Sequence, residues 1–172
     1  MLCVIAKTNA EATDRLQALC AAALPEAKPI YGHITVASYT GDNERRFIRT
    51  CKAMLKDVHA FTVVYGRIEV LSATSILVAV PESSKALESL HARIAERFGA
   101  ELDAWTGMDR WYPHTTLYYD PTADLEAIRR TVQMRFCPFS ARIARIEFSR
   151  VDENGCTIVD SAELSEVTNW EE

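Results

Sequence analysis

The feature that most constrains the fold of this chain is an internal correspondence between two stretches of sequence. Phe61 and Arg67–Glu69 recur 78 residues later as Phe139 and Arg145–Glu147. In each half this β-rich stretch follows a helical pattern, and a short strand that carries a histidine and a threonine precedes that helix. A chain of 172 residues that repeats such an αβ unit is expected to form two pseudo-symmetric lobes within a single domain, 1–172.

Hydrophobic periodicity divides the chain into alternating strands and helices. Alternating β-rich runs predict strands, and apolar residues at three- and four-residue intervals predict helices. Thr8 and Glu11 form a T-x-x-E capping box that is expected to open the first helix, and Gly99 is expected to cap the third. The expected strands cover 2–6, 31–37, 61–71, 75–80, 114–119, 141–151 and 156–164, and the helices are expected to begin near residues 8, 42, 81 and 121. This content predicts an α+β protein.

Charge and composition exclude several classes of protein. The net charge of -5 argues against a broad basic surface for long double-stranded nucleic acid. The N-terminus does not resemble a signal peptide, and no apolar run reaches membrane-spanning length. Five cysteines without C-x-x-C spacing, four of them within apolar helix or strand patterns, indicate buried thiols in a reducing compartment. We therefore expect a soluble, cytoplasmic monomer without a membrane partner.

Two of the four histidines are followed at the second position by threonine, in His33-Ile34-Thr35 and His114-Thr115-Thr116. Because residues i and i+2 of a strand share a face, each histidine is expected to point the same way as its threonine. The two motifs occupy matching places in the repeat, so a pseudo-two-fold packing of the halves would bring both polar faces to one cleft. A single phosphate group would fit between them.

These residue types suit the cleavage of a phosphodiester without a metal. The reaction needs a base for the attacking oxygen, an acid for the departing oxygen, and donors for the nonbridging oxygens. Two imidazoles with a reference pKa of about 6.5 can supply the base and the acid near neutral pH. The threonine hydroxyls can donate hydrogen bonds to the phosphate oxygens. The spacing does not tell which histidine is the acid.

The paired H-x-T-hydrophobic motifs, the second written Pro113-His114-Thr115-Thr116-Leu117, resemble those of the 2H phosphoesterase superfamily, most closely its 2'-5' RNA ligase and cyclic phosphodiesterase branch. The resemblance covers nearly the whole chain. It implies a bilobal fold with two facing antiparallel sheets and outer helices. It also implies metal-free action on 2',3'-cyclic phosphate or 2'-5' linked nucleotides, with His33 and His114 catalytic and Thr35 and Thr116 binding phosphate.

Three further residues are candidates for contact with the substrate. Tyr31 and Tyr112 each precede a motif histidine by two positions, so they are expected to share its face and to stack on a base or bond a phosphate oxygen; the alternative is that they fill the cleft floor. Arg110, in an expected loop over 100–111, is a candidate for a phosphate contact. His91 lies on the apolar face of its helix and is expected to be a packed, hydrogen-bonded residue.

Two other functions compete with the phosphodiesterase hypothesis. The first is a non-catalytic module that binds a nucleotide or an RNA end in the same cleft. The second is a metal hydrolase, which we disfavour because no H-E-x-x-H or similar ligand spacing is present. We therefore expect neither a metal nor a cofactor. The absence of a basic cluster beside either motif favours a small nucleotide or RNA-end substrate.

Overall fold

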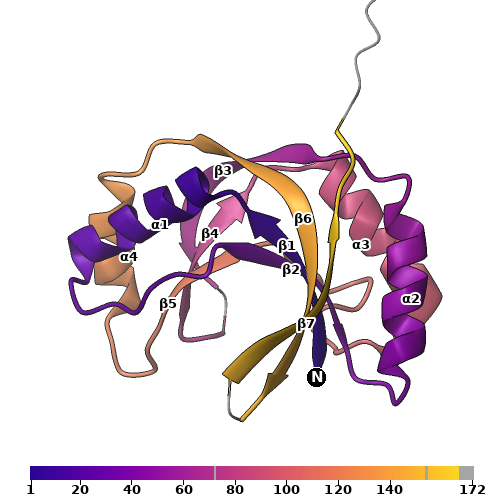
Figure 1. Ribbon diagram of the computed structural model, residues 1–172. Coiled ribbons are helices and arrows are strands. Elements are labelled where there is room, and N and C mark those ends of the chain that lie inside the picture. Colours follow the sequence, from indigo (N-terminus) through magenta and orange to yellow (C-terminus); the bar gives the residue numbers. More distant parts are fainter. Residues whose placement is uncertain (72, 154, 167–172) are drawn as a thin grey trace, which may run out of the picture.

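The computed structural model (Figure 1) describes residues 1–71, 73–153 and 155–166, so the last six residues of the expected domain lie outside the described part. Within the described residues, strands and helices alternate along the chain except at β3–β4 and β6–β7, where two strands follow each other, and one short 3-10 helix follows the third α-helix. The elements are β1 (Leu2–Thr8), α1 (Ala10–Ala23), β2 (His33–Tyr39), α2 (Glu44–Leu55), β3 (Phe61–Val70), β4 (Ile76–Pro81), α3 (Lys85–Phe98), η1 (Gly99–Glu101), β5 (Thr115–Tyr119), α4 (Leu125–Gln133), β6 (Phe139–Asp152) and β7 (Gly155–Glu163).

The named strands pair only in antiparallel fashion, and hydrogen bonding connects them in the order β2-β1-β6-β3-β4-β5, with β7 added beside β6. The long strand β6 joins the two halves, because its first residues pair with β3 and the remainder pairs with β7. The other edge of β6 pairs with β1. The expected α+β class is confirmed. The pairing of β6 with β3 joins the halves β2-β1-β6 and β3-β4-β5, so that hydrogen bonding runs through one continuous sheet.

The strand order is symmetric about its centre and shows which strands of the two repeat units correspond. β2 corresponds to β5, β1 to β4 and β6 to β3, so the repeating unit is β-α-β-α-β and β7 is an addition. The match of Phe61 with Phe139 is correct, since these residues begin β3 and β6. However, the counterpart of β4 is β1 and not β7. Each unit therefore contributes its last strand to the other half, an exchange that a linear pattern cannot reveal.

The helices pack on the outside in two pairs (Figure 1). α1 and α4 contact each other and lie at one end of the molecule, whereas α2 and α3 lie at the other end. At that second end, Phe47 of α2 stacks on Tyr39 of β2 with a centroid distance of 4.3 Å and meets Phe98 of α3 at 4.8 Å. These rings are almost fully buried. No helix in the described ranges has the length and apolar character needed to cross a bilayer.

Several element boundaries differ from those expected. Thr8 still pairs with Ile143 in the sheet, so α1 begins only after Asn9, which makes no side-chain cap bond; the prediction of a capping box is wrong. β4 likewise continues through Pro81, and the third helix begins at residue 85 behind a capping serine. In both cases the ladder to the neighbouring strand holds the residues that a local signal assigns to the helix. Gly99 is the C-cap of α3, as expected, but it keeps a right-handed helical conformation and leads into η1.

The cysteines divide into two groups. Cys3, Cys20 and Cys51 are buried, whereas Cys137 and Cys156 are exposed, and all five are free. The expectation of buried thiols, which rested on four cysteines in apolar patterns, is therefore confirmed for three. Cys137 lies in the loop after α4, and Cys156 lies near the β6–β7 turn, where little chain covers the strand.

Candidate functional site

The two H-x-T motifs meet because β2 and β5, at opposite ends of the strand order, approach each other. The Oγ1 of Thr115 donates a hydrogen bond of 2.7 Å to the carbonyl oxygen of His33. Thr115 is fully buried, and Tyr65 of β3 donates to the same hydroxyl at 2.5 Å. The residue beside His114 thus ties the start of one motif strand to the start of the other.

Both motif strands place their polar residues on one face. Ile34 and Thr115 are 0% exposed, whereas His33, Thr35 and His114 are only partly buried. Thr116, which lies on the same side of β5 as His114, is exposed. The alternation expected for strands therefore separates the polar members of each motif from the core.

In each H-x-T-hydrophobic motif, the hydrophobic fourth residue forms a β-bulge. In the β1–β2 ladder Val36 is the extra residue, and in the β4–β5 ladder it is Leu117. A bulge releases a backbone carbonyl from regular pairing and is common beside functional sites. Here the Nδ1 of His91 lies 2.8 Å from the Val36 carbonyl oxygen, and the Sγ of Cys20 lies 3.4 Å from that of Leu117. His91 is therefore a buried, hydrogen-bonded residue, as expected.

Backbone carbonyl groups fix the orientation of both motif imidazoles. The Nδ1 of His33 lies 2.6 Å from the carbonyl oxygen of Tyr31, and the Nδ1 of His114 lies 2.7 Å from that of Tyr112. A carbonyl oxygen can only accept, so Nδ1 must carry the proton in each ring. In the neutral form each Nε2 therefore has a free lone pair, as a general base requires.

Burial lowers the pKa of both imidazoles below the ordinary value of 6.5, and the hydrogen bonds to the carbonyl groups partly oppose this effect. The ammonium of Lys7 and the ring of His114 lower the pKa of His33 further, while Glu147 acts in the opposite direction. Lys7 is the ladder partner of His33, and its Nζ donates to the Gly32 carbonyl oxygen at 2.8 Å. The effect of the His114 ring on the pKa of His33 fits the placement of the two rings at one site.

The tyrosine before each motif reaches into the strand contributed by the other half of the repeat. The hydroxyl of Tyr31 donates to Glu147 Oε2 at 2.6 Å, and the hydroxyl of Tyr112 donates to Glu69 Oε2 at 2.6 Å. Each glutamate is paired with an arginine two residues before it on the same strand, at positions 145 and 67. These are the residues of the repeated Arg-Ile-Glu tripeptide, to which sequence reasoning assigned no role although the repeat made them visible.

The hydroxyl groups of both tyrosines are therefore engaged by carboxylates rather than free for a phosphate. Burial and the Glu147 hydrogen bond raise the pKa of Tyr31 to about 12, and the same causes with Glu69 raise that of Tyr112. The Lys7 ammonium lies over the Tyr31 ring, 4.1 Å from the ring centroid. Both tyrosines thus hold the motif histidines in position, and contact of the tyrosine rings with a nucleobase stays a prediction.

Open hollows flank the motifs on several sides. One of about 440 Å³ is lined by His33 and Thr35, one of about 500 Å³ by His33 and Thr116, and one of about 480 Å³ by Arg110, Tyr112 and His114. The middle hollow contains residues of both motifs. Arg110 lies near His114 as expected, and its contact with a phosphate stays a prediction. In the described part of the chain, no three His, Cys, Asp or Glu side chains gather as a metal site would require.

The loop before the second motif is pinned to the strand that carries the first. The backbone N–H of Asp103 donates to the Ser38 carbonyl oxygen at 2.8 Å, and the N–H of Ser38 donates to the Thr106 hydroxyl at 2.9 Å. The indole of Trp111 donates to the Thr35 carbonyl oxygen at 2.9 Å and stacks on His91 with a centroid distance of 4.0 Å. This loop therefore adds a second link between the motifs, which the sequence pattern did not indicate.

Comparisons with known proteins bear on the family and the fold of this chain. The model of the 2'-5' RNA ligase superfamily matches residues 4–155. Among solved structures, E. coli LigT complexed with 3'-AMP has a TM-score of 0.65 and 13% identity, covering 96% of this chain and 97% of LigT. A protein described as a phosphoesterase has a TM-score of 0.68 and 14% identity, covering 96% of this chain and 98% of its own. TT0787 of Thermus thermophilus has a TM-score of 0.64 and 15% identity, with the same coverage of 96% and 98%. At these identities the likeness concerns the fold. No curated protein sequence matches significantly.

Proposed function

Because this chain belongs to the 2'-5' RNA ligase superfamily, we propose that it is a metal-independent phosphodiesterase whose general acid and base are His33 and His114. Its substrate is a 2',3'-cyclic phosphate or a 2'-5' linkage, in a small nucleotide or at an RNA end. Thr35 and Thr116 donate hydrogen bonds to the nonbridging oxygens.

One observation carries this proposal: both imidazoles donate Nδ1–H to the carbonyl group of the residue two positions earlier. His91 makes a similar bond inside the core, so the fixed tautomer carries the proposal only together with access to a substrate. The two rings are held by pseudo-symmetric backbone, and each borders an open hollow. Such preorganisation suits in-line displacement, which needs a base and an acid on opposite sides of one phosphorus.

The roles of the histidines follow from the charges around them. Lys7 favours the neutral form of His33, so we assign the base to His33 and the acid to His114. In hydrolysis of a cyclic phosphate, Nε2 of His33 takes a proton from water as the water oxygen bonds to phosphorus. The bond from phosphorus to one ribose oxygen breaks, and Nε2–H of His114 protonates that oxygen. Proton exchange with solvent then restores both rings.

The choice of a nucleotide substrate draws on the structural relatives. E. coli LigT structures are described as complexed with 3'-AMP and with NADP+, both of which carry a ribose phosphate. Hollows of roughly 440 to 500 Å³ beside the histidines fall within the usual size range of small-molecule sites. The phosphate would lie between the motifs, with the nucleoside in one of these hollows.

The test is turnover of a panel of 2',3'-cyclic mononucleotides and 2'-5' dinucleotides in the presence of a chelator. The wild-type protein should hydrolyse at least one member, and His33→Ala and His114→Ala should each abolish this activity. Turnover that disappears in chelator and returns with a divalent metal would contradict the metal-free mechanism. Tight nucleotide binding without turnover, unchanged by His33→Ala, would favour the non-catalytic binding module.

A further inference from the structure

We propose that the outer face of helix α2 binds the phosphate backbone of a single-stranded RNA whose 3' end occupies the cleft. This inference rests on the proposed function and makes it more specific, since the preferred substrate becomes an RNA end rather than a free nucleotide. It also revises the expectation of a small substrate, which rested on the absence of a basic cluster beside the motifs in the sequence.

Four basic residues form a stripe along α2, at positions 45, 49, 52 and 56. The spacing of four, three and four residues places them on one face of the helix, over about 16 Å at a rise of about 1.5 Å per residue. Arg45, Arg49 and Lys56 are exposed. None of these three has an ion-pair partner among the described residues. Three of the four cations in the stripe therefore have no ion-pair partner within the part of the chain that the structure describes.

The stripe borders a shallow hollow of about 600 Å³ between α2 and β7, lined by Arg45, Ile48, Arg49, Lys52, Ala53, Lys56 and Asp160. Lys52 donates to Asp160 Oδ1 at 2.8 Å, so this lysine is held in place by the sheet. Asp160 is the one acidic residue in that lining. The hollow thus offers a strongly positive concave surface in a chain whose net charge is -5.

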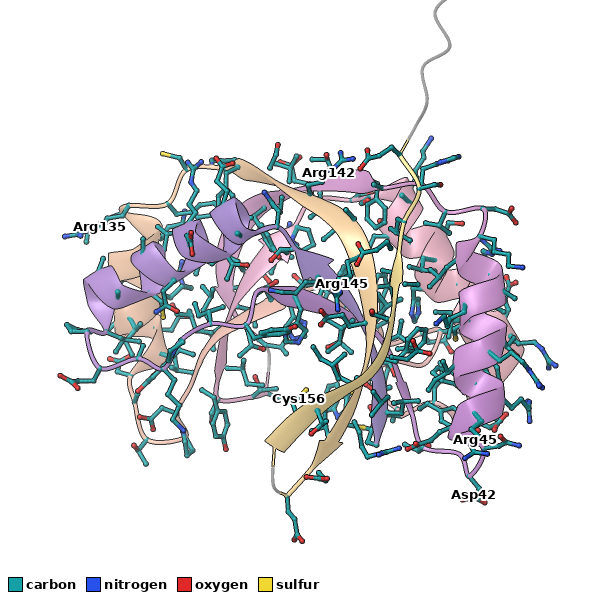
Figure 2. All side chains as sticks on the ribbon, in the orientation of Figure 1. Asp42, Arg45, Arg135, Arg142, Arg145 and Cys156 are labelled. Atoms are coloured by element: carbon teal, nitrogen blue, oxygen red, sulfur yellow. The ribbon has the colours of Figure 1, made fainter. Side chains whose placement is uncertain are left out.

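β7 connects this surface to the cleft. Cys156 and Ile158 of β7 line the hollow that contains His33, and Asp160 of the same strand lines the basic hollow. Ile158 and Asp160 are two residues apart, roughly 6 to 7 Å along a strand. Figure 2 shows Cys156 on β7 and Arg45 on α2, on the outer flank of the molecule. A strand of RNA that leaves the His33 hollow need only cross β7 to reach the stripe.

The pattern of charge favours a polyanion with regularly spaced charges. Like charges at three- and four-residue spacings repel one another and destabilise a helix, and the contacts of α2 with the core do not require them. The proposed function includes an RNA end among the substrates of the cleft, and phosphate backbones are held mainly by lysine and arginine. An acidic protein segment is the competing occupant, and the experiment below separates the two.

The experiment compares two substrates that share the same reacting group. One is a single-stranded RNA of about ten nucleotides ending in a 2',3'-cyclic phosphate, and the other is the matching cyclic mononucleotide. In R45Q/R49Q, kcat/KM for the RNA should fall about tenfold at low salt while the value for the mononucleotide stays unchanged. The slope of log kcat/KM for the RNA against log salt should decrease by about 1.4, roughly 0.7 for each lost phosphate contact.

The matched control is R130Q/R135Q, which removes two exposed arginines with no ion-pair partner among the described residues. Arg135 lies at the opposite end of the molecule from Arg45 (Figure 2). Glutamine has nearly the helix propensity of arginine, so both variants should fold, which circular dichroism verifies. Equal effects of the two variants on the RNA, or no preference for RNA over the mononucleotide, would overturn the proposal.

Binding separates this proposal from the proposed function. Fluorescence anisotropy of a labelled RNA ending in a 3' phosphate measures how tightly the RNA binds, whether or not the protein turns over any substrate. Binding that weakens in R45Q/R49Q supports the stripe even if hydrolysis fails. Binding of polyglutamate that weakens in R45Q/R49Q, with RNA binding unchanged, would assign the surface to an acidic protein and overturn the proposal.

Discussion

The half of the site built around His33 and the half built around His114 have the same parts but different surroundings. Both have a carbonyl-oriented imidazole, a bulge after the threonine, and a tyrosine that reaches a glutamate of the other repeat unit. Lys7 pairs with His33, whereas the matching position of β4 is Val80. The two halves thus supply two similar histidines, and the difference at the Lys7 position is the basis of our proposal that His33 is the base and His114 the acid.

The glutamates differ as well. The side chain of Glu147 is only 4% exposed, while that of Glu69 is 36% exposed. A buried carboxylate depends on its partners far more than a solvated one does. The His33 half is therefore expected to be the stiffer and electrostatically more constrained of the two, and the following predictions test that difference.

The largest effect should come from removing either imidazole. His33→Ala and His114→Ala should each lower kcat by about 10² to 10⁴-fold, the usual contribution of a positioned acid or base. The double variant should lose much less than the product of the two single losses, because the residues act as a unit. Single-turnover rates on a cyclic nucleotide provide the measurement. A residual rate near wild type in either variant would show that its half of the site is dispensable.

Stability should distinguish the two glutamates next. Glu147→Ala leaves Arg145 and the Tyr31 hydroxyl without their buried partner and should cost about 2 kcal/mol of unfolding free energy. Glu69→Ala removes a half-exposed ion pair and should cost less than about 1 kcal/mol. Urea denaturation of the two variants measures both values. Equal losses would mean that the asymmetry in burial has no energetic consequence.

The pH profile should show that both imidazoles are affected by burial. Because burial lowers both pKa values below 6.5, the form with one neutral and one protonated ring is most populated below pH 6.5. The value of kcat/KM should therefore peak below pH 6.5 and decline as pH rises, because the acid loses its proton. A maximum above pH 7.5 would contradict this assignment.

The smallest expected effect, a change in the titration of one ring, isolates Lys7. Lys7→Met removes a positive charge near His33, so the pKa of His33 should rise, while that of His114 should hardly change. NMR titration of the two imidazoles measures both. Val80→Leu, an apolar substitution at the matching position of the other half, is the control and should move neither. A shift of similar size at both rings would remove the basis for assigning the base to His33.

Much of this architecture could be predicted from local patterns. The alternation in His33-Ile34-Thr35 indicated which side chains leave the core, and the repeated Arg-Ile-Glu tripeptide aligned β3 with β6 correctly. Errors arose where a distant strand overrides a local signal. Thr8 belongs to the sheet because it pairs with Ile143, and no helix-start rule includes a partner 135 residues away in the sequence.

The sequence by itself determined the α+β class, the pairing of each histidine with its threonine, and the family to which the chain belongs, because these depend on periodicity and short spacings. Only the tertiary structure decided the exchange of β3 and β6 between the halves, the crossed Tyr31–Glu147 and Tyr112–Glu69 bonds, and the position of the α2 stripe beside β7. The physical reason is that hydrogen bonding between strands, and the burial that shifts a pKa, depend on residues that are neighbours in space and far apart along the chain.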